Sequence, residues 1–338
     1  MSAASIYPLV FEPILKEKVW GGRRLESYGK ILPGSAGIGE SWELADLSTT
    51  SASGGGGGEA RSVIANGSMA GRTLHQAIRL WGGDLLGEVK ATPEGGFPLL
   101  VKLLDARQNL SVQVHPSPEY ASASPGAHPK NECWYVLEAE PGSVIFKGIK
   151  PGVGPRAFAA AVEKGTAVDC LVALAAEPGD CHSLPSGTIH ALGAGVLVAE
   201  FQTPGDTTFR VYDWAVEYGR GERPLHVKQA LECIDYGPPP EQTRLARDQK
   251  KSRLAQADSF DLWEFRLESG RPIGDLPGGN GCAVLMVLSG EVRLSSGDGG
   301  FEELRLTKGM TVLIPAGNRG AVELLGMSPG ELLAVAFL

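Results

Sequence analysis

The sequence predicts a mainly β protein, a sandwich or barrel with a few helices added to it. The 338 residues include 46 glycines and 23 prolines, so the chain turns too often for a helical bundle. These residues follow no Gly-X-Y period, and 43% of the chain is hydrophobic, which excludes a collagen-like or wholly disordered protein. The remaining observation is a series of short apolar segments separated by turn residues, a pattern typical of sandwiches and barrels.

Ten short segments are expected to form strands because they are apolar, β-branched or aromatic and are bounded by turn residues. They are residues 99–104, 110–115, 133–137, 143–148, 195–202, 209–214, 262–267, 283–288, 291–294 and 311–314. The proline- and charge-rich stretch 237–252 separates the first six strands from the last four. We therefore expect two domains, residues 1–240 and 250–338.

Three segments have the periodicity of helices. In residues 74–81 the apolar side chains form one stripe, Thr73 is the candidate N-cap and two glycines end the pattern. Residues 224–234 and 155–162 show similar patterns. Residues 51–58 contain five successive glycines and are expected to form a flexible surface loop without chemistry.

The charge balance limits the classes of partner. A formal net charge of −8 offers no basic surface for nucleic acid, so an anionic ligand needs cations placed at its own site. No apolar stretch approaches the roughly 18 residues of a membrane span, and we expect a cytoplasmic protein without a membrane partner. The sequence leaves the oligomeric state open between a monomer and a weak dimer. Its cysteines form no C-x-x-C pair and are expected to be reduced and mostly buried: Cys133, Cys170, Cys181, Cys233 and Cys282.

Two segments place polar side chains on strands that are otherwise apolar. Residues 110–115 alternate strictly, so Ser111, Gln113 and His115 share one face. Lys130 and Glu132 share a face where the next strand begins. Taken alone, each pattern fits a solvent-facing strand or an exposed charge pair as well as it fits a site.

A third segment favours a site. Residues 179–190 have the spacing Gly-(x)5-Pro-x-Gly-x-x-His, which resembles the second motif of the cupin superfamily, where the histidine points into a small barrel. The resemblance implies two cupin domains of the jelly-roll or β-barrel type and a metal site formed by Gln113, His115, Glu132 and His190. A divalent ion of the zinc type suits such a mixed nitrogen and oxygen set. With one carboxylate, Zn²⁺ keeps a net charge of +1 and stays electrophilic.

The first motif departs from the usual cupin pattern, since Gln-x-His replaces His-x-His and the glutamate comes seventeen residues later. Residues 116–129 are therefore expected to be an insertion near the site. Here the chain resembles the type I phosphomannose isomerases, in their short bacterial or archaeal form. The matching strings are Leu-Ser-x-Gln-x-His-Pro at 110–116, Lys-x-Glu at 130–132, Gly-Thr-x-His-Ala at 187–191, and an acidic residue ten positions before an arginine at Glu200 and Arg210.

The resemblance implies interconversion of mannose 6-phosphate and fructose 6-phosphate through a cis-enediol, with one Zn²⁺ per chain. Arg210 and Lys130 are the cations it implies for the enediolate oxygen or the phosphate. Glu200 is expected to be either a general acid or base, with a pKa raised by apolar neighbours, or a buried carboxylate that only orients Arg210. Lys130, Glu200 and a metal-bound water are the candidate bases.

Four further residues are expected to contact or brace the substrate. Ser111 belongs to the first motif, and Trp20 and Glu40 resemble family residues that line the site. His128 comes from the insertion, which is expected to border the pocket. His182, inside the second motif, is expected to make local hydrogen bonds.

The spacing of the second motif recurs near the C-terminus. Residues 309–320 repeat Gly-(x)5-Pro-x-Gly-x-x, but Gly320 stands where His190 stands in the first copy. The second domain is therefore expected to be a degenerate cupin without metal ligands and with a structural role.

Two other functions are open at this point. The chain could be a non-catalytic sugar-phosphate sensor or regulator built on an isomerase relic, or another metal-dependent cupin enzyme such as an iron dioxygenase. The complete ligand set argues against the first, and the pair of cations suits a phosphorylated substrate better than the second.

Overall fold

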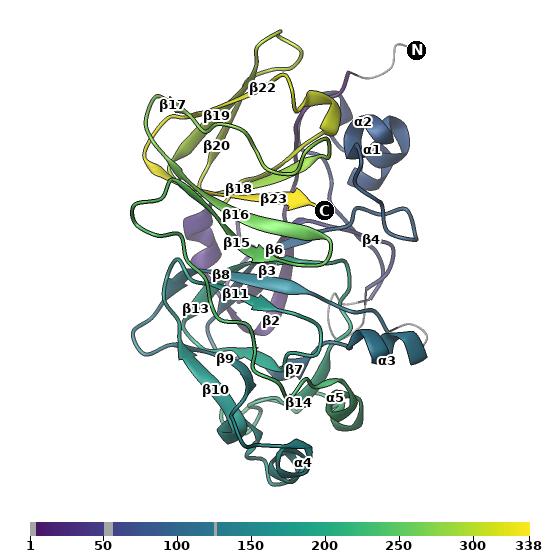
Figure 1. Ribbon diagram of the computed structural model, residues 1–338, viewed down its shortest axis with the longest axis vertical. Coiled ribbons are helices and arrows are strands. Elements are labelled where there is room, and N and C mark those ends of the chain that lie inside the picture. The colour runs from purple at the N-terminus through teal and green to yellow at the C-terminus, as the bar shows by residue number, and fades with distance from the viewer. Residues whose placement is uncertain (1–4, 51–56, 125–126) are drawn as a thin grey trace.

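The computed structural model describes residues 5–50, 57–124 and 127–338. The chain is mainly β, as expected, and its strands stack into a lower, teal barrel and an upper, green-to-yellow barrel in Figure 1. All ten expected strands are present, with ends that differ by a few residues. Of the glycine-rich loop, residues 51–56 lie outside the described part of the chain.

Two sheets build the lower barrel. The first has the order β11-β8-β13-β6-β2-β3, with bounds Cys181–Leu184, Glu132–Ala139, Val196–Gln202, Leu100–Ala106, Ile14–Gly22 and Ile38–Leu44. The second has the order β10-β9-β12-β7-β14, with bounds Leu171–Ala175, Val144–Ile149, His190–Leu192, Val112–Val114 and Phe209–Tyr212. A separate small ribbon pairs β4 (Asp46–Leu47) with β5 (Ala60–Arg61).

Two further sheets build the upper barrel. One has the order β1-β21-β18-β23-β16-β15, with bounds Leu9–Val10, Thr311–Ile314, Ala283–Ser289, Gly330–Phe337, Phe260–Leu267 and Lys251–Gln256. The other has the order β17-β22-β19-β20, with bounds Arg271–Pro272, Val322–Gly326, Glu291–Ser296 and Leu304–Thr307.

The two barrels repeat one topology. The order β11-β8-β13-β6 in the lower barrel matches β21-β18-β23-β16 in the upper barrel, and β10-β9-β12-β7 matches β20-β19-β22-β17. Eight strands of each barrel therefore correspond in chain order as well as in space. The lower barrel adds β2, β3 and β14, and the upper barrel adds β15 and the N-terminal strand β1.

The apolar side chains separate into layers that explain the stacking. The largest cluster lies between the two six-stranded sheets and combines Phe201 and Tyr135 of the lower barrel with Phe260 and Val335 of the upper one. A second cluster fills the upper barrel. A smaller one around Trp134 lines the interior of the lower barrel, where polar side chains also enter. Each large side chain buried in this way contributes about 1.5–3 kcal/mol of transfer free energy.

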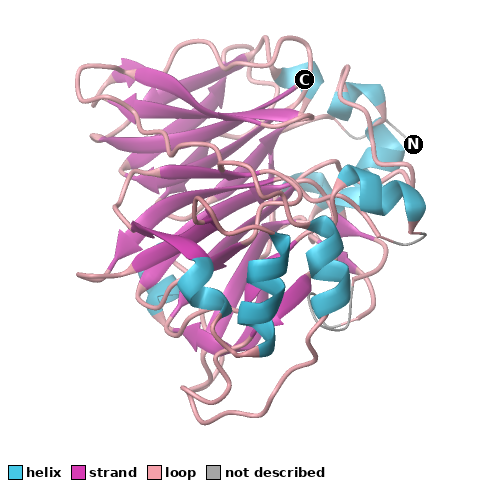
Figure 2. Ribbon diagram, turned by 60° about the horizontal axis from the view of Figure 1, so that its bottom comes forward, coloured by secondary structure: helices cyan, strands magenta, loops and turns pink. Residues whose placement is uncertain are grey.

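Five α-helices lie outside the barrels among the described residues, and Figure 2 shows helices gathered along one side of the strands. Their bounds are Leu74–Trp81 (α1), Gly83–Leu86 (α2), Pro118–Ala123 (α3), Pro155–Glu163 (α4) and Val227–Cys233 (α5). Helix α1 has the expected cap, because Thr73 and Gln76 exchange side chain to backbone hydrogen bonds. No helix in the described part of the chain has the length and apolar character needed to cross a bilayer.

Two local expectations need correction. Helix α5 begins at Val227 and not at Pro224, because the backbone N–H of His226 donates to the carbonyl of Arg210 and holds this stretch against β14. Sequence periodicity also missed α3, which starts with Ser117 as N-cap and Pro118 in its first turn. All five cysteines are free, and only Cys170 is partly exposed.

Candidate metal centre and active site

Neighbouring strands place three of the expected site residues in one row across the five-stranded sheet. His190 on β12 pairs with Gln113 on β7, and Gln113 pairs with Arg210 on β14. Cross-strand partners point to the same face of a sheet, so all three side chains point into the lower barrel. Glu132, at the start of β8, reaches the same point from the facing sheet.

Three buried side chains converge at this point. The ligating atoms of His115, Glu132 and His190 lie within 4.8 Å of one another. The Nε2 atom of His190 is 3.1 Å from Oε1 of Glu132, and the Nε2 atom of His115 is 3.6 Å from the same oxygen. All three side chains are at most 2% exposed. This is the group of histidine and acidic side chains that can hold a metal ion in the described part of the chain.

The backbone fixes which nitrogen of each histidine faces the centre. Nδ1 of His115 donates to the carbonyl of Thr207, and Nδ1 of His190 donates to the carbonyl of Thr188. Both rings therefore direct the Nε2 lone pair at the centre, the arrangement that metal-binding histidines have. Burial, with a further contribution from Lys130, lowers the pKa of His115 to about 4, so the ring is neutral and able to coordinate.

Two of the polar atoms at the centre lack hydrogen-bond partners, which fits a metal ion. Nε2 of His115 and Oε1 of Glu132 are buried and have no hydrogen-bond partner among the described residues, whereas the other oxygen of Glu132 forms an ion pair with Lys130. Such orphaned groups are costly unless a ligand satisfies them. Gln113 borders the group, with its amide nitrogen 3.3 Å from Nε2 of His190. Since amide nitrogen and oxygen are assigned from the hydrogen-bond network, either atom of Gln113 is available at this position.

Two carboxylates and two lysines form a charged network beside the centre. Lys130 lies 2.5 Å from Glu132 and 3.7 Å from Glu200, while Lys102 donates to Glu200 at 2.9 Å. Trp134 donates from its indole nitrogen to the other oxygen of Glu200 at 2.8 Å. Burial acts to lower the pKa of Lys130, but the negative charges of Glu132 and Glu200 outweigh burial and raise this pKa. Lys130 is thus a cation in this network.

The surroundings of Glu200 differ from both of its expected descriptions. Its partners are Lys102, Trp134 and Lys130, so it is not a carboxylate among apolar groups. The contacts described for Arg210 are with Asp213 and with the carbonyl of Pro224, so Glu200 is not what orients this arginine.

A cavity of about 70 Å³ opens above this network. It brings together seven of the eleven expected site residues: Trp20, Glu40, Ser111, Gln113, Lys130, Glu200 and Arg210. Three more, His115, Glu132 and His190, lie buried in the metal group. Glu40 forms an ion pair with Lys18 at 3.1 Å and accepts a hydrogen bond from the indole N–H of Trp42. Burial acts to raise the pKa of Glu40, but the positive charges of Lys18 and Lys102 outweigh burial and lower this pKa.

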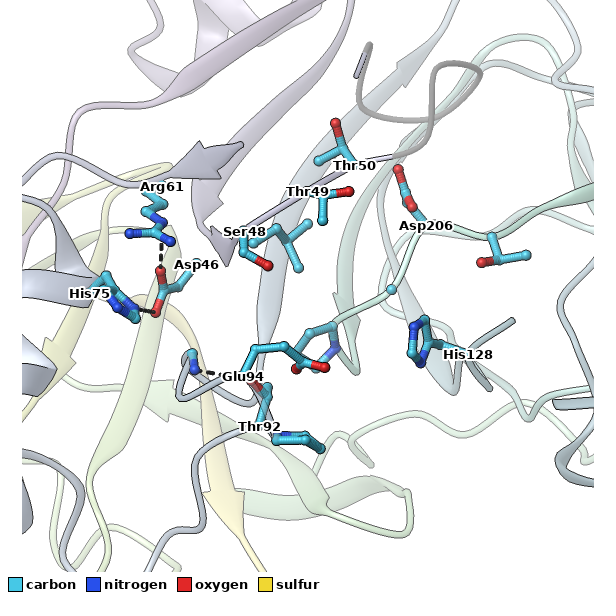
Figure 3. A pocket seen from close by; sticks show the side chains of 16 residues that line it. Asp46, Ser48, Thr49, Thr50, Arg61, His75, Thr92, Glu94, His128 and Asp206 are labelled. Atoms are coloured by element: carbon cyan, nitrogen blue, oxygen red, sulfur yellow. Dashed lines mark hydrogen bonds and ion pairs between the residues drawn. The ribbon is translucent and has the colours of Figure 1, made fainter. Parts of the chain in front are cut away.

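His128 lies elsewhere. It is exposed and borders a neighbouring cavity of about 590 Å³ that shares Asp206 with the smaller one. Figure 3 shows His128 beside Asp206, across this cavity from Asp46, Arg61 and His75. The structure therefore places His128 next to the cavity that holds the other site residues and not among its lining.

The sequence missed several residues that line the smaller cavity. Lys102 stands inside an apolar run, and the one available signal was a single charge in a strand that was expected to be apolar. Lys18 and Arg223 come from segments without a recognised motif, and Thr208 lies inside the motif that ends at Arg210 without having been expected at the site. His182 was wrongly expected to form local hydrogen bonds: it faces the barrel interior opposite Trp134, and neither ring nitrogen has a hydrogen-bond partner in the part of the chain described.

Comparison with known proteins agrees with this geometry. A family model described as the catalytic domain of phosphomannose isomerase type I matches residues 10–145. Mannose-6-phosphate isomerase ManA of Bacillus subtilis (strain 168) is 33% identical over 318 residues, covering 92% of this chain and 93% of that protein. The mannose-6-phosphate isomerase of Streptococcus mutans is 30% identical over 313 residues, covering 91% of this chain and 92% of that protein.

A solved structure extends the agreement to the whole fold. The crystal structure of the mannose 6-phosphate isomerase from Bacillus subtilis matches with a TM-score of 0.80 and 26% identity, covering 98% of this chain and 99% of that one. The chain therefore belongs to the type I phosphomannose isomerase family.

Proposed function

We propose that this chain is a metal-dependent isomerase that interconverts mannose 6-phosphate and fructose 6-phosphate. The observation that carries the proposal is the buried group of His115, Glu132 and His190, whose unsatisfied atoms converge beneath a cavity lined by Glu200 and Arg210. Relatives that match more than nine-tenths of the chain bear the name of the same activity.

The metal is proposed to be zinc. His115, Glu132 and His190 would hold it, with the amide of Gln113 as the fourth ligand, because two imidazoles, one carboxylate and one amide oxygen suit this ion. When bound, zinc supplies a positive charge that polarises the sugar carbonyl and stabilises negative charge on the enediolate.

The side chains of the cavity divide the remaining work. Glu200 takes the proton from C2 of the aldose and returns it to C1, while the hydroxyl proton passes from O2 to O1. Lys102 and Trp134 fix the carboxylate of Glu200, and Ser111 and Lys130 stand beside it to hold the sugar hydroxyls. Lys130 is assigned as a cation and not as the base, because its ammonium contacts two carboxylates. Arg210 stabilises the negative end of the substrate.

A coupled assay on purified protein tests this function. We expect conversion of mannose 6-phosphate, its loss on treatment with a chelator, and its return when zinc is added. Glucose 6-phosphate in the same assay measures selectivity for the configuration at C2. Full activity of metal-free protein would overturn the metal-dependent mechanism, and zinc-loaded protein without turnover would favour a sugar-phosphate sensor.

We also propose that residues 1–240 and 250–338 are two domains. The repeated strand order supports this division. Strand β1 (residues 9–10) nevertheless pairs with β21, so this strand belongs in space to the second barrel.

A further inference from the structure

The segment that joins β13 to β14 supports one of the metal-binding histidines. Residues 203–208 form neither helix nor strand, yet the carbonyl of Thr207 accepts the hydrogen bond from Nδ1 of His115 at 2.9 Å. This hydrogen bond determines which nitrogen of His115 faces the centre. The segment also borders both cavities, since Asp206 lines the smaller and the larger one (Figure 3). Because the segment lacks regular structure, the position of the Thr207 carbonyl depends on other contacts.

The side chain of Gln202, the last residue of β13, supplies two of these contacts. Its Nε2 donates to the carbonyl of Thr203 at 3.0 Å and to the carbonyl of Gly205 at 2.7 Å. Since a carbonyl oxygen can only accept, these two partners determine which way the amide of Gln202 is turned. Its Oε1 is buried and has no hydrogen-bond partner among the described residues. The hydrogen bonds of this side chain therefore hold the 203–208 segment.

Gln202 also lies beside a metal ligand. It is fully buried and pairs across the sheet with Glu132 on β8, so both side chains point into the lower barrel. Directly before Glu132, Asn131 exchanges two hydrogen bonds with Thr203. The N–H of Thr203 donates to the carbonyl of Asn131 at 3.0 Å, and the N–H of Asn131 donates to Oγ1 of Thr203 at 3.1 Å. The segment is thus tied at its start to the strand of Glu132 and near its end to His115.

In the upper barrel, alanine stands at the positions of both Gln202 and Glu132. By the repeated strand order, the pair of Gln202 and Glu132 corresponds to the pair of Ala336 and Ala283. A buried amide is costly unless it is hydrogen-bonded, so an apolar core is more stable without one. The amide and the carboxylate are therefore replaced at the same step of the sheet. This correspondence associates Gln202 with the metal centre rather than with the general packing of the fold.

We propose that Gln202 is a positioning residue of the metal centre: by holding the 203–208 segment, it keeps the carbonyl of Thr207 in place to orient His115. The proposal rests on the proposed function, since it requires His115 to bind the metal. A ligand whose ring is not held in place binds a metal more weakly, although the set of ligand atoms is unchanged. Gln202 accordingly determines the affinity for the metal and has little effect on turnover by the loaded protein.

Zinc affinity and the tautomer of His115 measure this role. Gln202→Met nearly keeps the volume of the side chain but cannot donate, so competition with a chromophoric chelator should show zinc bound about 10- to 100-fold more weakly. The kcat of the zinc-saturated variant should stay near wild type. In ¹⁵N NMR spectra of the zinc-free protein, His115 should change from one Nδ1–H tautomer to a mixture. His190, which donates to Thr188, should keep its tautomer.

Two further variants control this result. Gln256→Met changes an exposed glutamine on β15 of the upper barrel and should behave as wild type. Thr203→Val removes the hydroxyl that accepts from Asn131, so it acts on the same segment without changing the buried amide. This variant should also weaken zinc binding, by a smaller factor than Gln202→Met.

The outcomes separate this role from a structural one and from the isomerase function. Unchanged zinc affinity and an unchanged His115 tautomer in Gln202→Met would overturn the proposal. Equal changes at His115 and His190 together with a loss of thermal stability would also overturn it, because that result describes general packing. If Gln202→Met does not fold, unchanged zinc affinity in Thr203→Val would overturn it. If Gln202→Met weakens zinc binding but the wild type does not turn over mannose 6-phosphate, the isomerase function fails and the positioning role stands.

Discussion

The two barrels repeat the same strand order and the same turn, yet among the described residues the group that could hold a metal ion lies in the lower barrel. Gly179 and Gly309 open the two copies with φ of +91° and +83°, a conformation that favours glycine. After the Pro-x-Gly step the copies differ. His190 is the first residue of β12, whereas Gly320 lies in a turn before β22.

The register shows what replaces each site residue in the upper barrel. Glu132 faces Leu184 in the lower barrel, and Ala283 faces Ile314 at the corresponding step of the upper one. By the same count, Glu200 corresponds to Ala334. The interior of the upper barrel is accordingly an apolar cluster. The same backbone therefore forms a metal centre or a packed apolar core, depending on the residues at a few inward-facing positions.

The largest expected effect comes from replacing His190 in the lower barrel with glycine, the residue that the upper barrel has at position 320. In His190→Gly the group loses one of its ligating nitrogens, so the bound metal should fall from about one ion per chain to near zero and turnover should be lost with it. Metal analysis and the coupled assay measure both. Circular dichroism should remain that of a folded β protein, and retention of metal by this variant would contradict the assigned ligand set.

The second prediction concerns the acid–base role of Glu200, the residue that corresponds to Ala334 in the upper barrel. Glu200→Gln keeps the shape of the side chain but cannot accept the substrate proton, so kcat should fall by about 100- to 10,000-fold. Metal content should be unchanged because Glu200 is not a ligand. If kcat stays within a few-fold of wild type, another group is the base.

The interface between the barrels provides a smaller, pH-dependent effect. Burial, reinforced by Glu331, raises the pKa of Glu264 to about 7, and Tyr135 of the lower barrel contacts this carboxyl at 3.2 Å. The folded protein thus keeps a proton on Glu264 that the unfolded chain releases near pH 4.5. The resulting contribution to the free energy of unfolding is fully present below about pH 4.5 and is lost as the pH rises through 7.

Urea unfolding of Glu264→Gln at pH 5 and pH 8 measures this contribution. Relative to the variant, the wild type should lose about 1–3 kcal/mol between these two values. The exposed Glu241→Gln serves as the control and should follow the wild type. An identical pH dependence in wild type and Glu264→Gln would refute the link between this carboxyl and stability.

The smallest expected effect is the converse of the first. Gly320→His restores the missing histidine in the upper barrel, and open space surrounds this glycine. The stoichiometry should remain one metal ion per chain, because Ala283 stands where Glu132 stands in the lower barrel. A second bound ion would show that the histidine alone determines the difference between the barrels.

Much of this comparison could be predicted from the sequence. The turn motif and its copy indicated two related barrels, and the alternation in residues 110–115 indicated the polar face, because both signals are local and follow strand geometry. The partners of Glu200 could not be predicted, since Lys102 reaches it through the pairing of strands that lie almost a hundred residues apart. The place of Arg223 in the cavity lining depends likewise on how the segment after β14 folds back.

The N-terminal strands were missed for a related reason. Strand β2 carries two lysines that alternate with a glutamate on a partly exposed stretch and lacks a continuous apolar face. Its pairing with β3 and β6 is determined by tertiary packing. His128 shows the opposite error: it is near the site in sequence, but the insertion directs it toward the neighbouring cavity.

Anomalous diffraction from crystals of the zinc-loaded protein, recorded at the zinc edge, tests the central claim most directly. We expect one strong peak per chain, about 2.0–2.2 Å from Nε2 of His115, Nε2 of His190 and the carboxylate of Glu132, with none inside the upper barrel. A peak in the upper barrel, or fully active protein with no peak at these three residues, would contradict it.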